Sequence, residues 1–240
     1  MRPGSIPADE VHVWRGALDQ PSSVVARLQA LLSEPERART AAMRLARIRD
    51  RYVVGRGLLR TLLSHYVGVR PQDLEFAYGE HGKPYLEGVG PWFNLSHSRD
   101  VALFAFSSGA EVGVDVELEH RRVEPLRIAQ RFFSEVEVAA LRSLPDASRA
   151  RAFLACWTRK EAFIKARGDG LTLPLRSFDV TLLPGEPATV LRTEWSATEA
   201  AEWELLDVSH PETRTVAAVA MRSRGWHVVH RDASAILNSL

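Results

Sequence analysis

The stretch VGVDVE, Val112–Glu117, decides how this chain is organised. Side chains alternate along a strand, so Gly113, Asp115 and Glu117 share one face and the valines share the other. Two carboxylates ~4 Å apart repel by roughly 4 kcal/mol at an effective dielectric constant of ~20, so the pair needs a cation, a shared proton or water. Mg²⁺ answers that need, because it binds one or two carboxylates together with water and substrate phosphate oxygens. An edge strand with a solvated acidic face is the alternative.

The composition excludes several classes of protein. The 240 residues, 45% of them hydrophobic, are enough for one large or two small packed domains. Thirty-one basic and 30 acidic residues leave a net charge of +1, which argues against a nucleic-acid-binding protein. The single cysteine, Cys156, excludes an intrachain disulfide. The apolar run Val216–Met221 is too short to span a bilayer, and the N-terminus has no signal-peptide core, so we expect no membrane association and a cytoplasmic location.

Lysine is rare in this chain. Only Lys83, Lys160 and Lys165 are lysine among the 31 basic residues. Either a compact ammonium group is required at these three positions, or the bias toward arginine reflects codon usage alone.

The first half contains a predicted strand and an arginine-rich helix. Alternation predicts a strand at Val11–Leu18, and helical spacing of apolar residues predicts a helix at Asp50–Val67. This start places Arg51 in the first helical turn, where free N–H groups and the helix dipole favour a phosphate. Arg44 is a second, weaker candidate for phosphate binding, and a solvated arginine face is the alternative for both.

Two further segments of the first half carry polar candidates. A glycine-rich turn presents Lys83 and Pro84 at a loop tip. The predicted strand Phe93–Ser98 directs Ser96 to one face, together with Asn94 and Ser98, and directs His97 to the other. Adjacent serine and histidine therefore diverge, and without a Gly-x-Ser-x-Gly elbow a serine hydrolase is not indicated.

In the second half, a long helix is predicted from about Ser148 to Arg167, closed by Gly168. Lys160 falls in the middle of its apolar arc. Glu161 and Lys165, four residues apart, are either a surface ion pair or, with Lys160, a charged rim beside a metal-bound phosphate. Ahead of this helix, Ser134 and Glu137 form a predicted capping box for a helix at 135–144.

An internal repeat predicts the fold class. Pro71–Tyr78 is predicted to be a strand. Its first part, Pro71–Phe76, follows a helix and a loop, and Pro174–Val180 does the same about half a chain later. We expect an α+β fold of two similar halves related by a pseudo-twofold axis, each a small, mainly antiparallel sheet packed with a long helix. The predicted lobes are 1–110 and 111–240, with 225–230 closing the second sheet and the active site in the cleft between the lobes.

Five motifs in this order resemble the phosphopantetheinyl transferases, of the monomeric two-lobed type that activates carrier domains of peptide and polyketide synthases. The resemblance covers about residues 32–180. The motifs are GKPYL (82–86), FNLSHS (93–98), VGVDVE (112–117), RFFS (131–134) and WTRKEAFIKARGDGL (157–171).

The resemblance implies a reaction and a site. Phosphopantetheine would pass from coenzyme A to a serine of an acyl or peptidyl carrier protein, with Mg²⁺ or Mn²⁺ as cofactor. Residues at the matching positions divide into three groups. The metal ligands would be Asp115, Glu117 and Glu161; the catalytic residues would be Glu161, as base for the carrier serine, and Lys165; and the coenzyme contacts would be Arg51, Lys83, Pro84, Ser96, His97, Lys160 and Lys165, with Arg44 as an uncertain addition.

Two other functions remain open from the sequence. One is a coenzyme A-binding regulatory module without transferase activity. The other is an RNA-binding protein that uses the arginines of residues 37–60, which the near-zero net charge disfavours. The carrier proteins served, the pathway and the acyl-coenzyme A tolerance are not determined by the sequence.

Overall fold

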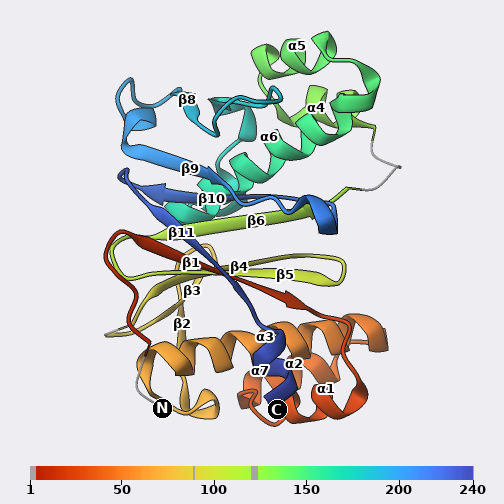
Figure 1. The fold of residues 1–240 in the computed structure, drawn as a ribbon, viewed down its shortest axis with the longest axis vertical. Coiled ribbons are helices and arrows are strands. Elements are labelled where there is room, and N and C mark those ends of the chain that lie inside the picture. The colour runs from red at the N-terminus through yellow and green to blue at the C-terminus, as the bar shows by residue number, and fades with distance from the viewer. Residues whose placement is uncertain (1–3, 89, 120–123, 240) are drawn as a thin grey trace.

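The computed structural model describes residues 4–88, 90–119 and 124–239, and it forms four layers in the order helices, sheet, sheet, helices (Figure 1). Each half runs strand, three helices, a short two-stranded ribbon and two further strands. The first half contains β1 (Glu10–Ala17), α1 (Ser22–Gln29), α2 (Glu34–Ala41), α3 (Ala46–Val67), β2 (Phe76–Tyr78), β3 (Pro84–Leu86), β4 (Trp92–Ser98) and β5 (Val101–Ser107). The second contains β6 (Val112–Leu118), α4 (Pro125–Phe132), α5 (Glu135–Ser143), α6 (Asp146–Arg167), β7 (Phe178–Val180), β8 (Val190–Thr193), β9 (Trp203–Asp207) and β10 (Thr215–Arg222).

The two main sheets have matching topology. The first has the order β11-β1-β5-β4, in which β11 is His227–Asp232, and the second has the order β6-β10-β9. Strand β5 is antiparallel to β1 and β4, as β10 is to β6 and β9. The triplets β1-β5-β4 and β6-β10-β9 are therefore equivalent, which confirms the predicted α+β fold of two similar halves.

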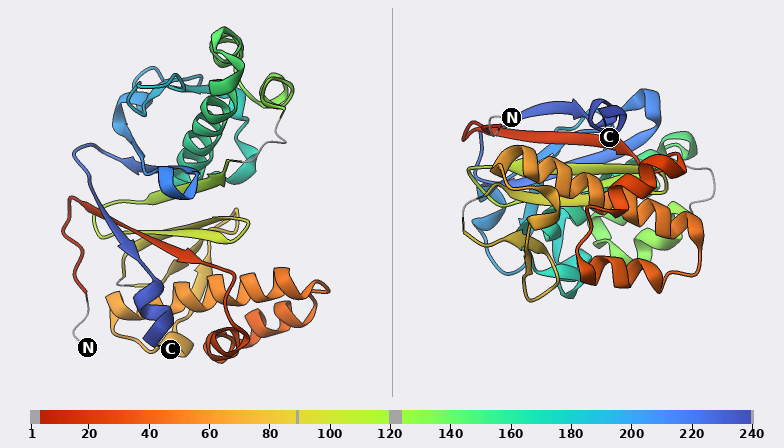
Figure 2. Two further views of the ribbon diagram at one scale, coloured as in Figure 1. Left: turned by 45° about the vertical axis from the view of Figure 1, so that its right-hand side comes forward. Right: turned by 90° about the horizontal axis from the view of Figure 1, so that it is seen from below.

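Hydrophobic burial explains the layers. Val112, Val114 and Val116 of β6 face the first sheet and form an inter-sheet core with residues such as Val11 and Val13 of β1. Helix α3 covers the outer face of the first sheet, and α6 covers the outer face of the second (Figure 2). The opposite face of β6 is thereby directed toward α6, and this face carries Asp115 and Glu117.

The long helices correspond closely. Helices α3 and α6 each have 22 residues, and each ends at a glycine in the left-handed region, Gly68 with φ 73° and Gly168 with φ 80°. Glycine adopts this conformation without the steric penalty that a Cβ atom imposes. The predicted end of the second helix at Gly168 is confirmed, as is the capping box of Ser134 and Glu137 at the start of α5.

Three predicted boundaries were wrong. Helix α3 begins at Ala46, so Arg51 lies in its second turn and is not at the dipole end. Much of the segment predicted as a strand at 71–78 is a 3₁₀ turn, Pro71–Asp73, before β2. Strand β11 pairs parallel to β1 and does not close the second sheet.

The position of β11 also changes the lobe boundary. After β10 the chain crosses back, and α7 (Ser234–Ser239) packs on the first half through Leu237 (Figure 1). The first lobe therefore comprises residues up to about 110 together with 227–239, instead of 1–110 alone. Without β11, strand β1 would be an edge strand of the first sheet; pairing with β11 satisfies the backbone N–H and C=O groups along that edge.

None of the helices described here is both long and apolar enough to cross a membrane.

Candidate active site at the junction of the two halves

The acidic strand β6 meets the serine-bearing face of β4 at the junction of the halves. Ser96 Oγ donates a hydrogen bond of 2.7 Å to Asp115 Oδ1, and Ser98 Oγ donates one of 2.7 Å to Glu117 Oε2. Asn94 Oδ1 accepts a bond of 2.9 Å from the backbone N–H of Val114. Side chains at alternate positions of β4 therefore fix the acidic strand, and the predicted sharing of one face by these β4 residues is confirmed.

Lys165 of α6 is the cation of this cluster. Its Nζ lies 2.6 Å from Asp115 Oδ1 and 3.0 Å from Ser96 Oγ, and it also donates to the carbonyl oxygen of Val114 at 3.3 Å. The Asp115 side chain is buried, whereas Lys165 keeps 28% of its side chain exposed. The ammonium thus compensates the buried carboxylate, and part of the lysine side chain still reaches solvent.

Glu161 lies one turn before Lys165 on α6 and is half-buried. Desolvation raises the pKa of its carboxyl above the ordinary value, and the negative charges of Asp115 and Glu117 raise it further, while Lys165 acts in the opposite direction. The structure therefore brings Glu161 into the electrostatic field of the acidic strand, as the sequence predicts. A carboxyl group with a raised pKa is a better proton acceptor once it is ionised.

The acids are neighbours but do not form a preassembled metal shell. No group of three or more His, Cys, Asp and Glu side chains in the described ranges is placed to hold a metal ion. The donor set nevertheless fits a hard divalent cation, because Asp115 Oδ2 is buried and has no hydrogen-bond partner among the described residues. A buried carboxylate oxygen without a partner is costly unless a cation or donor reaches it.

A cavity of about 610 Å³ opens beside this cluster on the first half. It lies between α3 and β4, and Arg51, His97 and Pro84 are among the residues that line it. Arg51 donates to both carboxylate oxygens of Asp19, at 2.6 and 2.8 Å. The cavity wall desolvates His97 and lowers its pKa, and the positive charges of Lys165 and Arg51 lower it further.

Five of the predicted coenzyme contacts do not line this cavity. Ser96 and Lys165 belong to the acidic cluster beside it, and the other three are Lys83, Arg44 and Lys160. Lys83 donates to the carbonyl oxygen of Ala166 at 3.1 Å and lines a separate cavity of about 460 Å³ with Glu111. Its burial lowers the pKa of its ammonium group, although Glu111 acts in the opposite direction. Arg44 is exposed in the connection between α2 and α3 and does not line the larger cavity, although its neighbour Met43 does.

The structure contradicts the predicted role of Lys160. Its side chain is 0% exposed and its Nζ lies 2.8 Å from Glu137 Oε1, on a different face of α6 from the acidic cluster. It also donates to the carbonyl oxygens of Leu175, at 2.7 Å, and Phe178. An ammonium group has three N–H donors, and all three are used inside the second half, so none is left for a pyrophosphate.

Comparison with known proteins identifies the family. A family model for the 4'-phosphopantetheinyl transferase superfamily matches residues 111–220. The chain is 41% identical over 223 residues to 4'-phosphopantetheinyl transferase HetI from Nostoc sp. (strain PCC 7120), covering 91% of this chain and 90% of the relative. The chain belongs to the 4'-phosphopantetheinyl transferase superfamily. As relatives of this identity and coverage carry the transferase name, it is an enzyme of that class.

Other transferases match over shorter spans. Transferase Sfp from Bacillus subtilis (strain 168) is 36% identical over 135 residues, 55% of this chain and 58% of the relative. The putative transferase slr0495 from Synechocystis sp. (strain PCC 6803) is 38% identical over 163 residues, 67% of this chain and 65% of the relative. Holo-[acyl-carrier-protein] synthase from Thermotoga maritima matches at a TM-score of 0.37 and 22% identity, over 48% of this chain and 64% of that one.

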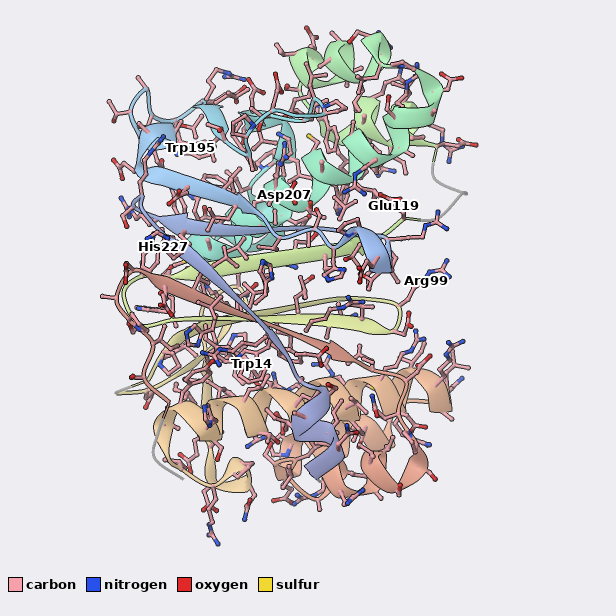
Figure 3. The ribbon with its side chains drawn as sticks, in the orientation of Figure 1. Trp14, Arg99, Glu119, Trp195, Asp207 and His227 are labelled. Atoms are coloured by element: carbon pink, nitrogen blue, oxygen red, sulfur yellow. The ribbon has the colours of Figure 1, made fainter. Side chains whose placement is uncertain are left out.

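For this phosphopantetheinyl transferase, sequence reasoning missed several residues at the site. Asn94 and Ser98 fix β6 as directly as Ser96 does; alternation along β4 placed them on the face of Ser96, but they were not predicted as site residues. Arg56 and Arg99 line the cavity beside Arg51 and were not singled out. Figure 3 labels Arg99 just after β4 and Glu119 just after β6, at the same end of the two sheets.

Proposed function

We propose that this transferase moves the 4'-phosphopantetheine group of coenzyme A to a serine of apo acyl or peptidyl carrier proteins, as a monomer and with Mg²⁺. The observation that carries the proposal is the cluster in which Asp115, Glu117 and Glu161 meet Lys165 beside an arginine-lined cavity. Acidic side chains and fixed cations at one place suit a reaction on a diphosphate.

The cation site would be formed by the three acids. Asp115, Glu117 and Glu161 would hold Mg²⁺, and the buried Asp115 Oδ2 supports this because it has no partner among the described residues. Bound there, the ion would neutralise charge on the diphosphate of coenzyme A. Mn²⁺ has similar ligand preferences and would serve in its place.

The chain's own residues would supply the rest of the reaction. Arg51 and His97 would bind phosphate groups of the coenzyme in the cavity, and Lys165 would stabilise charge on the diphosphate. The carrier serine Oγ forms a bond to the phosphorus of the phosphopantetheine group, and the bond from this phosphorus to the oxygen of the departing adenosine bisphosphate breaks. Glu161 would accept the serine proton, directly or through water.

The test is the transfer itself. Apo carrier domains of several types are incubated with coenzyme A, Mg²⁺ and the protein, and mass spectrometry is used to detect the phosphopantetheine increment on the carrier. We expect the increment with wild type and its strong suppression by Glu117→Gln. No increment on any carrier, combined with calorimetric binding of coenzyme A, would instead favour the regulatory module.

A further inference from the structure

Lys160 is the centre of a buried cluster in the second half. Its ammonium group contacts Glu137 and the carbonyl oxygens of Leu175 and Phe178, and it lies 4.3 Å from the ring centroid of Phe178. Glu137 Oε1 also accepts from the backbone N–H of Val180 at 2.9 Å. One lysine therefore connects α6 to the start of α5 and to the segment that leads into β7.

The first half repeats this arrangement with arginine. Arg60 of α3 donates to Glu36 Oε2 at 2.7 Å and to the carbonyl oxygens of Pro71 and Leu74 at 2.8 and 3.0 Å. Its guanidinium lies 5.0 Å from the ring centroid of Phe76 in β2. Arg60 is 1% exposed and is thus about as buried as Lys160, but Glu36 also pairs with Arg56, which lines the larger cavity.

The correspondence extends to sequence position. Glu36 and Glu137 are each the N3 residue of a capping box, at the start of α2 and α5 respectively. Each accepts from a cation near the middle of the long helix that follows. Because Arg60 occupies the position of Lys160 in a half that carries no acidic strand, this position serves helix anchoring in both halves.

In the second half, this anchoring acts directly on the active site. Lys160 precedes Glu161 in α6, and consecutive helical residues point about 100° apart, so one is held in the interior while the next faces β6. Anchoring through Lys160 thus sets the rotation and the axial position of the helix that carries Glu161 and Lys165. A buried ion pair is weak support for stability by itself, but it can fix one arrangement of the packed elements.

We infer that Lys160, paired with Glu137, is a positioning residue for the transfer reaction: it holds α6 so that Glu161 meets Asp115 and Glu117 in the geometry that binds the metal. The inference rests on the proposed metal-dependent function. It replaces direct contact between Lys160 and pyrophosphate as the reason for a lysine at this position.

The test compares the two clusters by matched substitutions. Lys160→Met and Arg60→Met each remove a buried cation from the equivalent position of a long helix. Arg60 lies outside the proposed binding machinery, and its partner Glu36 keeps a second cation, Arg56. Mn²⁺ binding in the presence of coenzyme A is measured by the loss of the free-ion electron paramagnetic resonance signal. Melting temperature and transfer kinetics are measured on the same samples.

We expect Lys160→Met to weaken Mn²⁺ binding by about 10-fold or more, the range seen when residues that orient metal ligands are lost. Its kcat should fall while its KM for coenzyme A changes little, and Lys160→Arg should recover much of the Mn²⁺ affinity. Arg60→Met should lower the melting temperature without changing Mn²⁺ binding. If Lys160→Met does not fold, Lys160→Met combined with Glu137→Gln removes both buried charges, and the same weakening of Mn²⁺ binding is expected.

Three results would overturn the inference. If the Lys160 variants bind Mn²⁺ as tightly as wild type does, the Lys160–Glu137 cluster has a purely structural role. A raised KM for coenzyme A with unchanged Mn²⁺ binding would instead indicate that Lys160 contacts a phosphate of the coenzyme directly. If wild type binds no Mn²⁺, both this inference and the metal-dependent function are wrong. If Mn²⁺ binding depends on Lys160 but no carrier is modified, only the proposed function is contradicted.

Discussion

Gly113 of β6 and Ala162 of α6 are packed so closely that no side chain fits between them. A Cβ atom built on Gly113 would lie far inside van der Waals contact with the carbonyl oxygen of Ala162, and 3.0 Å from the Cα of Ala166. The obstructing atoms belong to the backbone, so they cannot rotate away. The absence of a side chain at Gly113 therefore sets how near Glu161 and Lys165 come to the acidic strand.

Gly113→Ala should displace α6 and damage both stability and activity. Overpacking of this kind typically destabilises by about 1–3 kcal/mol or more, and each 1 kcal/mol corresponds to about 2–4 °C in melting temperature for a chain of this size. Thermal unfolding followed by circular dichroism measures the loss. Gly16→Ala is the matched control in β1, because the added Cβ would meet the side chain of Leu58, which can adjust. An equal loss in both variants would argue against the close approach at Gly113.

Glu161→Gln should stabilise the metal-free protein while it impairs transfer. Because the pKa of Glu161 is raised in the folded state, its protonated form is favoured there, and stability is lost as pH rises from the ordinary value of 4.5 through the folded pKa. The neutral amide avoids this loss. We therefore expect the melting temperature of the variant to exceed that of wild type above about pH 5 in the presence of a chelator, with the gap closing toward acid.

The exposed residue Glu80 provides a control, because Glu80→Gln removes a carboxyl that is not buried and should leave the melting temperature unchanged. Excess Mg²⁺ should stabilise wild type more than Glu161→Gln, since the variant loses one proposed ligand. If the melting temperature of Glu161→Gln is below that of wild type at every pH, the ionised carboxylate of Glu161 does not destabilise the folded protein, which contradicts the prediction.

Coenzyme A should bind more tightly as the pH falls from 8 to 6. His97 has a lowered pKa, through desolvation and the charges of Lys165 and Arg51, with Asp115 opposing, so it is neutral in the free protein at pH 8. A bound phosphate would favour the imidazolium, so protons are taken up on binding. Calorimetry in buffers of different ionisation enthalpy measures this uptake. His97→Ala should abolish it, and an unchanged proton uptake would exclude His97 as the source.

Asp115→Asn should reduce the rate of transfer by about 10²–10³, the effect typical of losing one electrostatic contact to the transition state. The substitution also leaves the ammonium group of Lys165 without its carboxylate partner. Asp179→Asn is a matched control, since Asp179 is likewise buried with one unpartnered oxygen in the described structure but pairs with Arg192, remote from β6. Comparable losses of rate in the two variants, measured at equal folded fraction, would show that burial and not position explains the effect.

The sequence alone determined the faces of the elements and several of their ends. Alternation placed Asp115 and Glu117 together and separated Ser96 from His97, and the glycine at 168 marked the end of α6. These are local properties, because the period of a strand or helix and the left-handed preference of glycine depend on neighbouring residues only.

Only the tertiary structure decided what covers each face. Lys160 was correctly placed in an apolar arc, but its partner Glu137 comes from another helix, and pairing between distant segments leaves no periodic signal in the sequence. The same reason applies to β11, whose partner β1 lies more than 200 residues away in the chain. Packing between elements determines which predicted cations reach the acidic cluster. It brings Lys165 to Asp115 and holds Lys160 inside the second half. A buried ammonium group is stable only where carboxylate and carbonyl oxygens surround it.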